Sequence, residues 1–196
     1  MLAAVADAVA TKGYAAMTIG DVTSRARVSR DSFYAQFADK QACFLAAYDA
    51  ITDSLLEELV AVGLDHASYV DGMREGVRAY LRFWQDHQEA AHVWLDSIYA
   101  AGSDARAHRE RALRRFERLF VTIAERARSE TPGLPRSPAV VLRTLIVGCM
   151  ELTSHYVREG RSEQVGELED GILYSWLLGI AGHEVAARAV ASGNAA

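Results

Sequence analysis

The chain has few of the residues that interrupt helices. Of its 196 residues only three are proline, and all three fall between positions 132 and 138, so long helices are permitted almost everywhere else. No segment alternates apolar and polar residues as strands do, whereas apolar residues recur at helical spacing along most of the chain. These absences predict an all-α fold.

Cysteines and long hydrophobic runs are equally scarce. The two cysteines, Cys43 and Cys149, lie far apart within apolar patterns, which favours buried free thiols in a reducing compartment over a disulfide. The uncharged stretch 171–183 is shorter than the roughly 18 apolar residues that cross a bilayer, so no membrane span is expected. The first ten residues lack the basic start of a secretory signal. We therefore expect a cytoplasmic protein.

Charge is distributed unevenly along the chain. The net charge of -5 argues against a nucleic-acid partner for the chain as a whole. Residues 1–45, however, carry five basic and four acidic side chains, while residues 46–196 carry 16 basic and 22 acidic ones. This asymmetry suggests two domains with different partners, at 1–45 and 46–196.

Helix-start residues support the division of the chain into helices. Thr18 with Asp21 matches a capping pattern, Ser29 and Asp39 suit two further helix starts, and Ser137 before Pro138 suits another. Together with the apolar spacing, these signals predict nine helices, at 2–12, 19–26, 30–36, 40–62, 69–87, 89–101, 104–129, 138–159 and 163–191.

The second and third predicted helices are short and close together. They span 19–26 and 30–36, and their apolar residues are spaced so that one helix packs across the other. Two short crossed helices joined by a turn of three residues are typical of a helix-turn-helix, in which the second helix enters the major groove of DNA.

A set of residues in and around these two helices forms a specific pattern: Gly13, Tyr14, Met17, Thr18, Ile19, Val22, Ala26, Arg27, Val28, Ser29, Phe33, Tyr34, Phe37, Asp39 and Lys40. Through this set the chain resembles the TetR family of transcriptional regulators over about its first quarter. Arg27 departs from the family pattern, because it stands where the family usually has a glycine in the turn. A positive φ there would cost Arg27 of order 1 kcal/mol, although its side chain also offers a phosphate contact.

The polar side chains of this segment are candidates for DNA contact. Arg30 can bind guanine or a phosphate, Asp31 can accept from cytosine, and Ser32 can bond either way. Thr18, Tyr34 and Lys40 match family positions that contact phosphates, although a solvated charged face is the alternative for the charged residues. The full set of predicted DNA-binding residues is Thr18, Arg27, Ser29, Arg30, Asp31, Ser32, Tyr34, Gln36 and Lys40.

Aromatic residues gather in the middle of the chain, where the resemblance implies a small, often apolar effector enclosed by helices. An ordinary solid core is the alternative for any single residue. We expect a hydrophobic or aromatic effector with few polar groups. The predicted lining residues are Tyr80, Trp84, His87, Trp94, Tyr99, Phe120 and His155.

The last two predicted helices are apolar over more than one stripe, which suggests burial against a second subunit. The resemblance implies a homodimer joined by a four-helix bundle, so that two recognition helices reach successive major grooves of a pseudo-palindromic double-stranded operator. The predicted interface residues are Ile146, Met150, Ile172, Trp176 and Ile180.

No catalytic or metal-binding motif is present. The chain lacks G-x-S-x-G, a phosphate-cradling glycine loop, C-x-x-C and H-E-x-x-H, and His87 and His92 are five residues apart, which does not place them on one helical face. The sequence therefore predicts a regulator without cofactor or metal rather than an enzyme. The resemblance favours a repressor, and the alternative is an all-helical carrier or enzyme that does not bind DNA.

Overall fold

A computed structural model describes residues 1–63 and 66–193, and within these ranges the chain contains helices and no strand. The predicted all-α fold is therefore confirmed. The α-helices are α1 (Leu2–Ala16), α2 (Ile19–Ala26), α3 (Arg30–Tyr34), α4 (Lys40–Gly63), α5 (Tyr69–Asp86), α6 (Gln88–Ala91), α7 (Ser103–Glu130), α8 (Ala139–Arg158), α9 (Glu169–Ala181) and α10 (His183–Gly193). Three further segments are the π-helix η1 (His92–Asp96) and the 3-10 helices η2 (Ser97–Ala100) and η3 (Ser162–Leu168).

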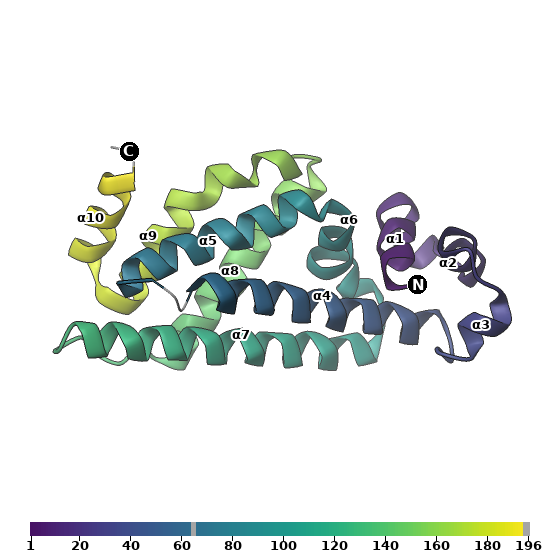
Figure 1. The fold of residues 1–196 in the computed structure, drawn as a ribbon, viewed down its shortest axis with the longest axis horizontal. Coiled ribbons are helices and arrows are strands. Elements are labelled where there is room, and N and C mark those ends of the chain that lie inside the picture. Colours follow the sequence, from purple (N-terminus) through teal and green to yellow (C-terminus); the bar gives the residue numbers. More distant parts are fainter. Residues whose placement is uncertain (64–65, 194–196) are drawn as a thin grey trace.

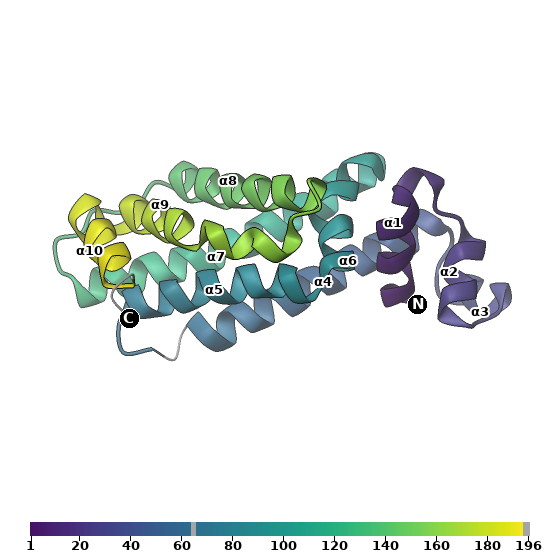
Figure 2. The same cartoon turned by 90° about the horizontal axis from the view of Figure 1, so that it is seen from above.

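The molecule is elongated, with α1, α2 and α3 at one end and α10 at the other (Figure 1). Helix α4 begins beside the three short helices and runs into the larger part, where it packs against α5 and α7. Figure 2 shows α8 and α9 side by side on another face of that part. Helix α1 packs on α4, α6, η1 and η2, so both parts meet along α1 and α4.

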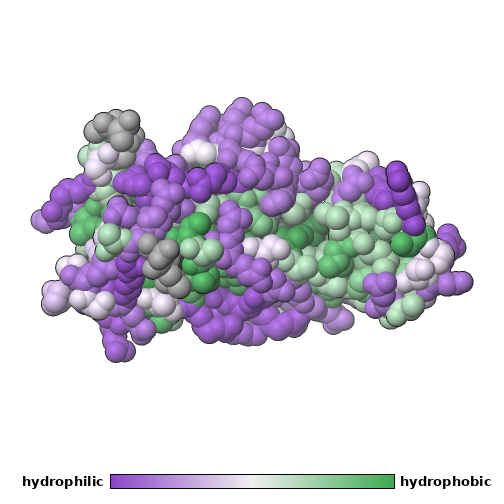
Figure 3. All heavy atoms as spheres, in the orientation of Figure 1, coloured by the Kyte–Doolittle hydropathy of each residue, from purple (hydrophilic) through white to green (hydrophobic). Residues whose placement is uncertain are grey.

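Hydrophilic residues cover much of the larger part on the face drawn in Figure 3. Apolar residues come to the surface on the same face toward the three N-terminal helices. The region where the two parts meet is therefore less polar than the surface of the larger part.

Glycines end two helices through backbone conformations that other residues rarely adopt. The predicted helix 2–12 ends where Gly13 takes φ 74° and ψ 159°, after which one more turn completes α1. The predicted single helix 163–191 is wrong, because Gly182 with φ 91° separates α9 from α10 and a 3-10 segment precedes α9.

The predicted helix 89–101 is also wrong. In its place the chain forms α6, then the π-helix η1, then the 3-10 helix η2. Three consecutive residues of η1, Val93, Trp94 and Leu95, are all buried, so the apolar residues of this segment do not follow the period of an amphipathic α-helix.

The start of α8 differs from the prediction in detail. Ser137 does not cap the helix, because its hydroxyl donates instead to the carbonyl oxygen of Gly179 in α9, at 2.9 Å. Helix α8 is long and apolar enough to cross a membrane by length and composition alone, and 33% of that window is buried inside the fold. Both cysteines are free thiols, as expected.

Candidate functional site

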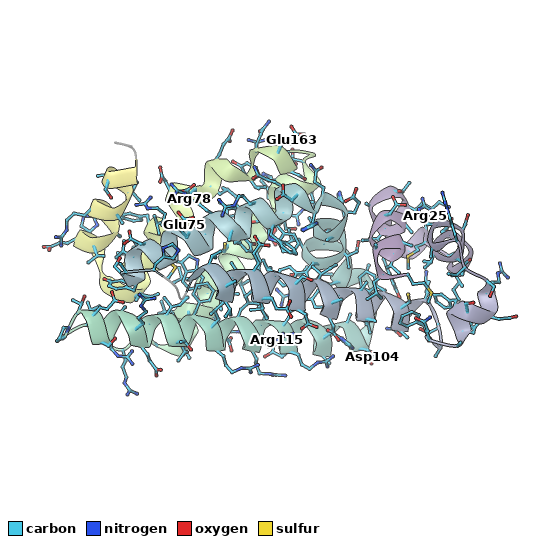
Figure 4. All side chains as sticks on the ribbon, in the orientation of Figure 1. Arg25, Glu75, Arg78, Asp104, Arg115 and Glu163 are labelled. Carbon is cyan, nitrogen blue, oxygen red and sulfur yellow. The ribbon has the colours of Figure 1, made fainter. Side chains whose placement is uncertain are left out.

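The start of α2 is held by reciprocal hydrogen bonds. The Thr18 hydroxyl accepts from the Asp21 amide at 3.2 Å, and the Asp21 carboxylate accepts from the Thr18 amide at 2.9 Å. Lys12 donates to the same carboxylate at 2.5 Å, and this bond holds the pKa of Asp21 far below its usual range. Arg25, labelled in Figure 4, reaches from α2 to Asp7 of α1 at 2.6 Å. The predicted cap is confirmed, and α1 fixes the position of α2.

The turn after α2 has the conformation that Arg27 was expected to resist. Arg27 has φ 54° and ψ 44°, the left-handed region, and it is the one residue other than glycine with positive φ in the described ranges. Its side chain is exposed, and within those ranges it forms no ion pair with an acidic side chain. The guanidinium group is therefore available to a phosphate.

Helix α3 presents most of the predicted DNA-binding residues on one exposed surface. Ser29 caps it by accepting from the Ser32 amide at 3.0 Å, and Phe33 is fully buried beneath it against Phe37, with 5.6 Å between the ring centroids. The helix ends at Tyr34, two residues earlier than predicted, so Gln36 lies in the following turn. The exposed side chains are those of Ser29, Arg30, Asp31, Ser32, Tyr34 and Gln36.

Arg30 folds back over the first turn of α2. A Cβ atom at Gly20 would lie 3.7 Å from Nη2 of Arg30 and 3.6 Å from Oγ1 of Thr18, so the glycine leaves room for the guanidinium group. Unpaired amides at a helix start bind phosphate oxygens. The position of Arg30 beside that start fits a phosphate contact better than a base contact.

Lys40 is not free to act as predicted. Its Nζ donates to three backbone carbonyl oxygens that follow the bend in α1, those of Tyr14 at 3.2 Å, Ala15 at 3.1 Å and Met17 at 3.1 Å. It also lies 4.9 Å from the centroid of the Tyr14 ring. Because all three N–H donors are engaged, Lys40 anchors the end of α1 to the start of α4 instead of contacting a phosphate.

The larger part contains an apolar cavity between α4, α5, α7, α8 and α9. Its volume is about 50 Å³. A water molecule needs roughly 10–15 Å³ by the same measure, so the cavity admits only a few atoms until side chains move. The lining residues include Leu59, Met73, Gly76, Val77, Tyr80, Trp94, Phe116, Leu119, Phe120, Ile123, Ile146, Cys149, Met150, Ile172 and Trp176.

Three of the seven predicted lining residues, Tyr80, Trp94 and Phe120, face this cavity. Trp84 is completely buried behind it, against the Trp94 ring at 5.3 Å. The other three, His87, Tyr99 and His155, do not face this cavity, and each of these side chains lies at the surface.

Local backbone changes explain the misplaced residues. Helix α5 ends at Asp86, so His87 leaves the buried stripe and lines an open cleft between α1, α4, α5 and α6. Tyr99 follows the π-helix, which shifts the helical register, and is 64% exposed under the guanidinium group of Arg109. His155 lies on the outer face of α8.

The five predicted interface residues are buried within the subunit itself. Ile146, Met150, Ile172 and Trp176 line the cavity, and Ile180 is buried beside them. The Trp176 ring stacks on Phe120 with 3.6 Å between centroids. These residues are therefore not available to a partner. The apolar side chains that α8 and α9 do expose are Val140 (69%), Leu152 (50%) and Leu178 (46%).

The cavity offers very few polar groups. The Tyr80 hydroxyl lies 3.2 Å from Oγ1 of Thr153, which in turn donates to the Cys149 carbonyl oxygen at 2.9 Å. Burial raises the pKa of Tyr80 well above its ordinary value and the pKa of Cys149 to about 12, so both stay neutral. Such a wall suits an uncharged, apolar part of a ligand.

Trp94 connects the cavity to the helices that position α2 and α3. Its Nε1 donates to Oγ1 of Thr52 in α4 at 2.7 Å, and its ring stacks on Tyr48 with centroids 5.7 Å apart and planes 8° apart. The π-helix that carries Trp94 also packs against α1. A change at the cavity wall can therefore reach both α1 and α4.

Metal binding has no support in the described residues, where no group of three or more His, Cys, Asp or Glu side chains is placed to hold an ion. Many charged residues of the larger part form ion pairs at the surface. Examples labelled in Figure 4 are Arg78 with Glu75 at 2.8 Å and Arg115, which lies 2.5 Å from Asp53.

Comparisons with known proteins agree with this arrangement. Residues 2–47 match the family model described as "Bacterial regulatory proteins, tetR family". No curated protein matches the sequence.

Solved structures share the fold over most of the chain. The transcriptional regulator FadR from Bacillus subtilis, in complex with stearoyl-CoA, is 14% identical, with 92% of this chain and 96% of that chain covered and a TM-score of 0.79. FadR from Bacillus halodurans, a fatty acid degradation regulator, is 10% identical, with the same coverage and a TM-score of 0.80. The TetR family transcriptional regulator PfmR from Thermus thermophilus is 20% identical, with 88% and 96% covered and a TM-score of 0.65.

Proposed function

We propose that the chain, whose residues 2–47 match the model of the TetR family of bacterial regulatory proteins, is a homodimeric repressor released from its operator by a hydrophobic effector. Residues 1–45 bind DNA, and residues 46–196 hold the effector and the dimer interface. Regulators of this family are generally not enzymes. The observation that carries the proposal is the capped α2–α3 pair, which exposes one polar surface beside a larger part with an apolar cavity.

DNA binding in this proposal depends on a small number of phosphate contacts. Arg27 and Arg30 are the basic side chains of the α2–α3 segment without an acidic partner in the described ranges, whereas Lys12 and Arg25 are paired. Two contacts in each half of a dimer amount to about four phosphates, so the logarithm of the binding constant should fall with the logarithm of the salt concentration with a slope of about −4.

Selection of bound fragments from random DNA tests this function directly. The expected product is a pseudo-palindrome whose half-sites lie about one helical turn apart. Arg30→Ala should weaken binding to all sequences about equally and reduce the salt slope by about 2 in the dimer. A change of base preference at one position would instead assign Arg30 to base reading, and no enrichment of any sequence would refute the function.

The cavity is the proposed effector site, and Gly76 provides a way to fill it. Gly76 lines the cavity, and a Cβ atom added there meets no heavy atom within 4 Å. Gly76→Leu should therefore occupy the space of the effector, bind the operator as before and no longer respond to an apolar probe such as decanol. Gly76→Ala is the matched control, since it gives a similar gain in helix propensity but adds one methyl group only. A Gly76→Leu protein that still responds would place the effector elsewhere.

The effector proposal agrees with one solved relative. FadR from Bacillus subtilis, which shares the fold, holds stearoyl-CoA, a ligand with a long apolar chain. The wall of this cavity is apolar and aromatic, and the helices around it belong to the shared fold. An effector with a flexible or flat apolar part fits the lining better than a sugar or a nucleotide.

The dimer interface in this proposal is the outer face of α8 and α9, which exposes Val140, Leu152 and Leu178. Leu178→Asp would place a charge in the buried centre of that interface and should give monomers with little operator affinity. Val121→Asp is a suitable control, because Val121 of α7 is 41% exposed, close to the 46% of Leu178. Sedimentation that finds Leu178→Asp still dimeric would move the interface to another face.

A further inference from the structure

Two polar atoms are buried without hydrogen-bond partners where α4 and α7 meet, outside the lining of the cavity and on the far side of Trp94. They are Oη of Tyr48 in α4 and Nε of Arg109 in α7. Tyr48 is completely buried, and the neighbouring residues Asp49 and His108 are hydrogen-bonded at 2.9 Å, so the two helices are in contact at this level. A buried donor without an acceptor is costly and calls for an explanation.

Arg109 lacks the ion pair that its neighbours Arg111 and Arg115 on α7 each make. Arg111 lies 3.6 Å from Asp49 and Arg115 lies 2.5 Å from Asp53, whereas Arg109 has no carboxylate at ion-pair distance in the part of the chain that the structure describes. Its guanidinium carbon lies 5.1 Å from the centroid of the Tyr99 ring. Arg109 is therefore a positive charge without a directly paired carboxylate, flanked by an aromatic ring, and the carboxylate within its electrostatic reach, Glu110, is paired with Arg143 and Arg114.

Tyr48 and Arg109 lie within electrostatic reach of each other. Burial raises the pKa of Tyr48, the charge of Arg109 opposes part of that rise, and the charges of Asp49 and Tyr99 add to it. The Tyr48 hydroxyl can donate a hydrogen bond, and Arg109 can only donate. One acceptor placed between them would satisfy both, and a carboxylate would also balance the charge of Arg109.

The pair also lies in line with the cavity. Arg109, Leu113, Phe116 and Phe120 follow one another at spacings of four, three and four residues, so they share one face of α7. Phe116 and Phe120 line the cavity, and Arg109 lies about 10 Å beyond Phe116 along the helix axis. Trp94 lies between the cavity and Tyr48, because it lines the cavity and its ring stacks on the Tyr48 ring.

We propose that Tyr48 and Arg109 form a carboxylate site on the far side of Trp94 from the cavity, and that the effector is a hydrophobic carboxylic acid. The inference deepens the proposed function, because it rests on the same cavity as the effector site. The apolar chain lies among the cavity residues, and the carboxylate accepts from Nε of Arg109 and Oη of Tyr48. Entry of the acid turns the Trp94 ring aside, since that ring separates the two parts of the site.

The test compares two probes of equal chain length, decanoate and decanol, on the full chain. The three tryptophans of the sequence, Trp84, Trp94 and Trp176, lie at or directly behind the cavity wall, so intrinsic fluorescence reports binding of either probe. Decanoate should bind about tenfold more tightly than decanol, because a hydrogen bond to a charged group contributes more than one between neutral groups.

Variants then distinguish binding of the carboxylate group from binding of the apolar chain. Arg109→Gln should remove the preference for decanoate and leave the affinity for decanol within about twofold. Tyr48→Phe removes a single oxygen atom from a buried ring and should lower the affinity for decanoate but not for decanol. This second variant tests the site even if the Arg109→Gln protein does not fold. Arg111→Gln, a change of a surface arginine on the same helix, is the matched control and should leave both affinities unchanged.

The outcomes distinguish this inference from the proposed function. Equal binding of decanoate and decanol by the wild type, with Gly76→Leu abolishing both, would overturn the carboxylate site and keep the cavity as the effector site. A preference for decanoate that survives both Arg109→Gln and Tyr48→Phe would also overturn it. Binding of neither probe by the wild type would overturn the hydrophobic effector and the carboxylate site together.

Discussion

The left-handed backbone at Arg27 predicts that replacing this residue by glycine stabilises the protein, whereas most substitutions destabilise a protein. A non-glycine residue in the left-handed conformation costs roughly 1–2 kcal/mol, and Arg27 has φ 54° and ψ 44°. Glycine removes that cost, but its greater conformational freedom in the unfolded chain destabilises the folded state by about 0.5–1 kcal/mol. Arg27→Gly should therefore raise the free energy of unfolding by about 0.5–1 kcal/mol.

Thermal unfolding is the suitable assay. For a chain of this length 1 kcal/mol corresponds to a shift in Tm of about 2–4 °C, so Arg27→Gly should raise Tm by about 1–4 °C. Arg27→Ala is the matched control, because it removes the same side-chain charge and keeps a Cβ atom in the left-handed conformation. Arg27→Ala should therefore show no rise.

DNA binding distinguishes the two roles of Arg27. If its guanidinium group contacts a phosphate, Arg27→Gly and Arg27→Ala should lose operator affinity equally and show the same smaller salt slope. The reasoning about the backbone would be refuted if Arg27→Ala were stabilised as much as Arg27→Gly, since the gain would then come from removing a charge.

Three further predictions concern single contacts. Lys40→Met keeps the side-chain stem but leaves three carbonyl oxygens at the end of α1 without their donor, so chemical denaturation should show a loss of about 1–3 kcal/mol, and an unchanged midpoint would contradict the anchoring role. The hydrogen bond from Lys12 lowers the pKa of Asp21 in the folded state. The ionised carboxylate therefore stabilises the fold above the unfolded-state pKa of about 4, and this contribution is lost as the pH falls from there toward the folded-state pKa. An Asp21→Asn protein should lack that part of the acid dependence when melting temperatures are measured across a pH series. Thr52→Val leaves Nε1 of Trp94 buried without an acceptor and should cost about 1–3 kcal/mol in denaturant unfolding, whereas a neutral result would show that the indole finds another acceptor.

The helix-turn-helix was predictable because its signals are local. Thr18, Ser29 and Asp39 each accept a hydrogen bond from an amide three residues ahead, as their positions in the sequence indicate. The positive φ at Arg27 could be anticipated only from the family resemblance, since arginine itself carries no such preference. The anchoring role of Lys40 depends on the bend at Gly13, which brings carbonyl groups of α1 toward a residue more than 20 positions away.

The apolar cavity was only partly predictable, because helical spacing of apolar residues identifies a buried face but not where the helix stops. The stripe through Tyr80 and Trp84 leads to His87, yet the backbone at His87 has φ −124° and ψ 56° and turns the ring outward. The π-helix after α6 has the same effect on Tyr99. Residues 87–101, which contain both breaks, include neither proline nor glycine, so the local sequence gives no signal for either break.

The predicted interface residues are buried within the subunit for a reason that also bears on the proposed outer face. Helices α8 and α9 are apolar on two faces, and the larger side chains, such as Trp176 and Met150, were assigned to the partner. The structure buries them in the cavity, and the close approach of α9 to α8 explains the arrangement: a Cβ atom at Gly179 would lie 2.8 Å from Leu145 and 3.3 Å from Val141. The two helices approach closely at this glycine, and on their outer side Val140, Leu152 and Leu178 remain exposed. The apolar residues of α8 and α9 therefore lie in two places, at the cavity and at the outer surface, and the exposed set is the one that the proposed dimer would bury.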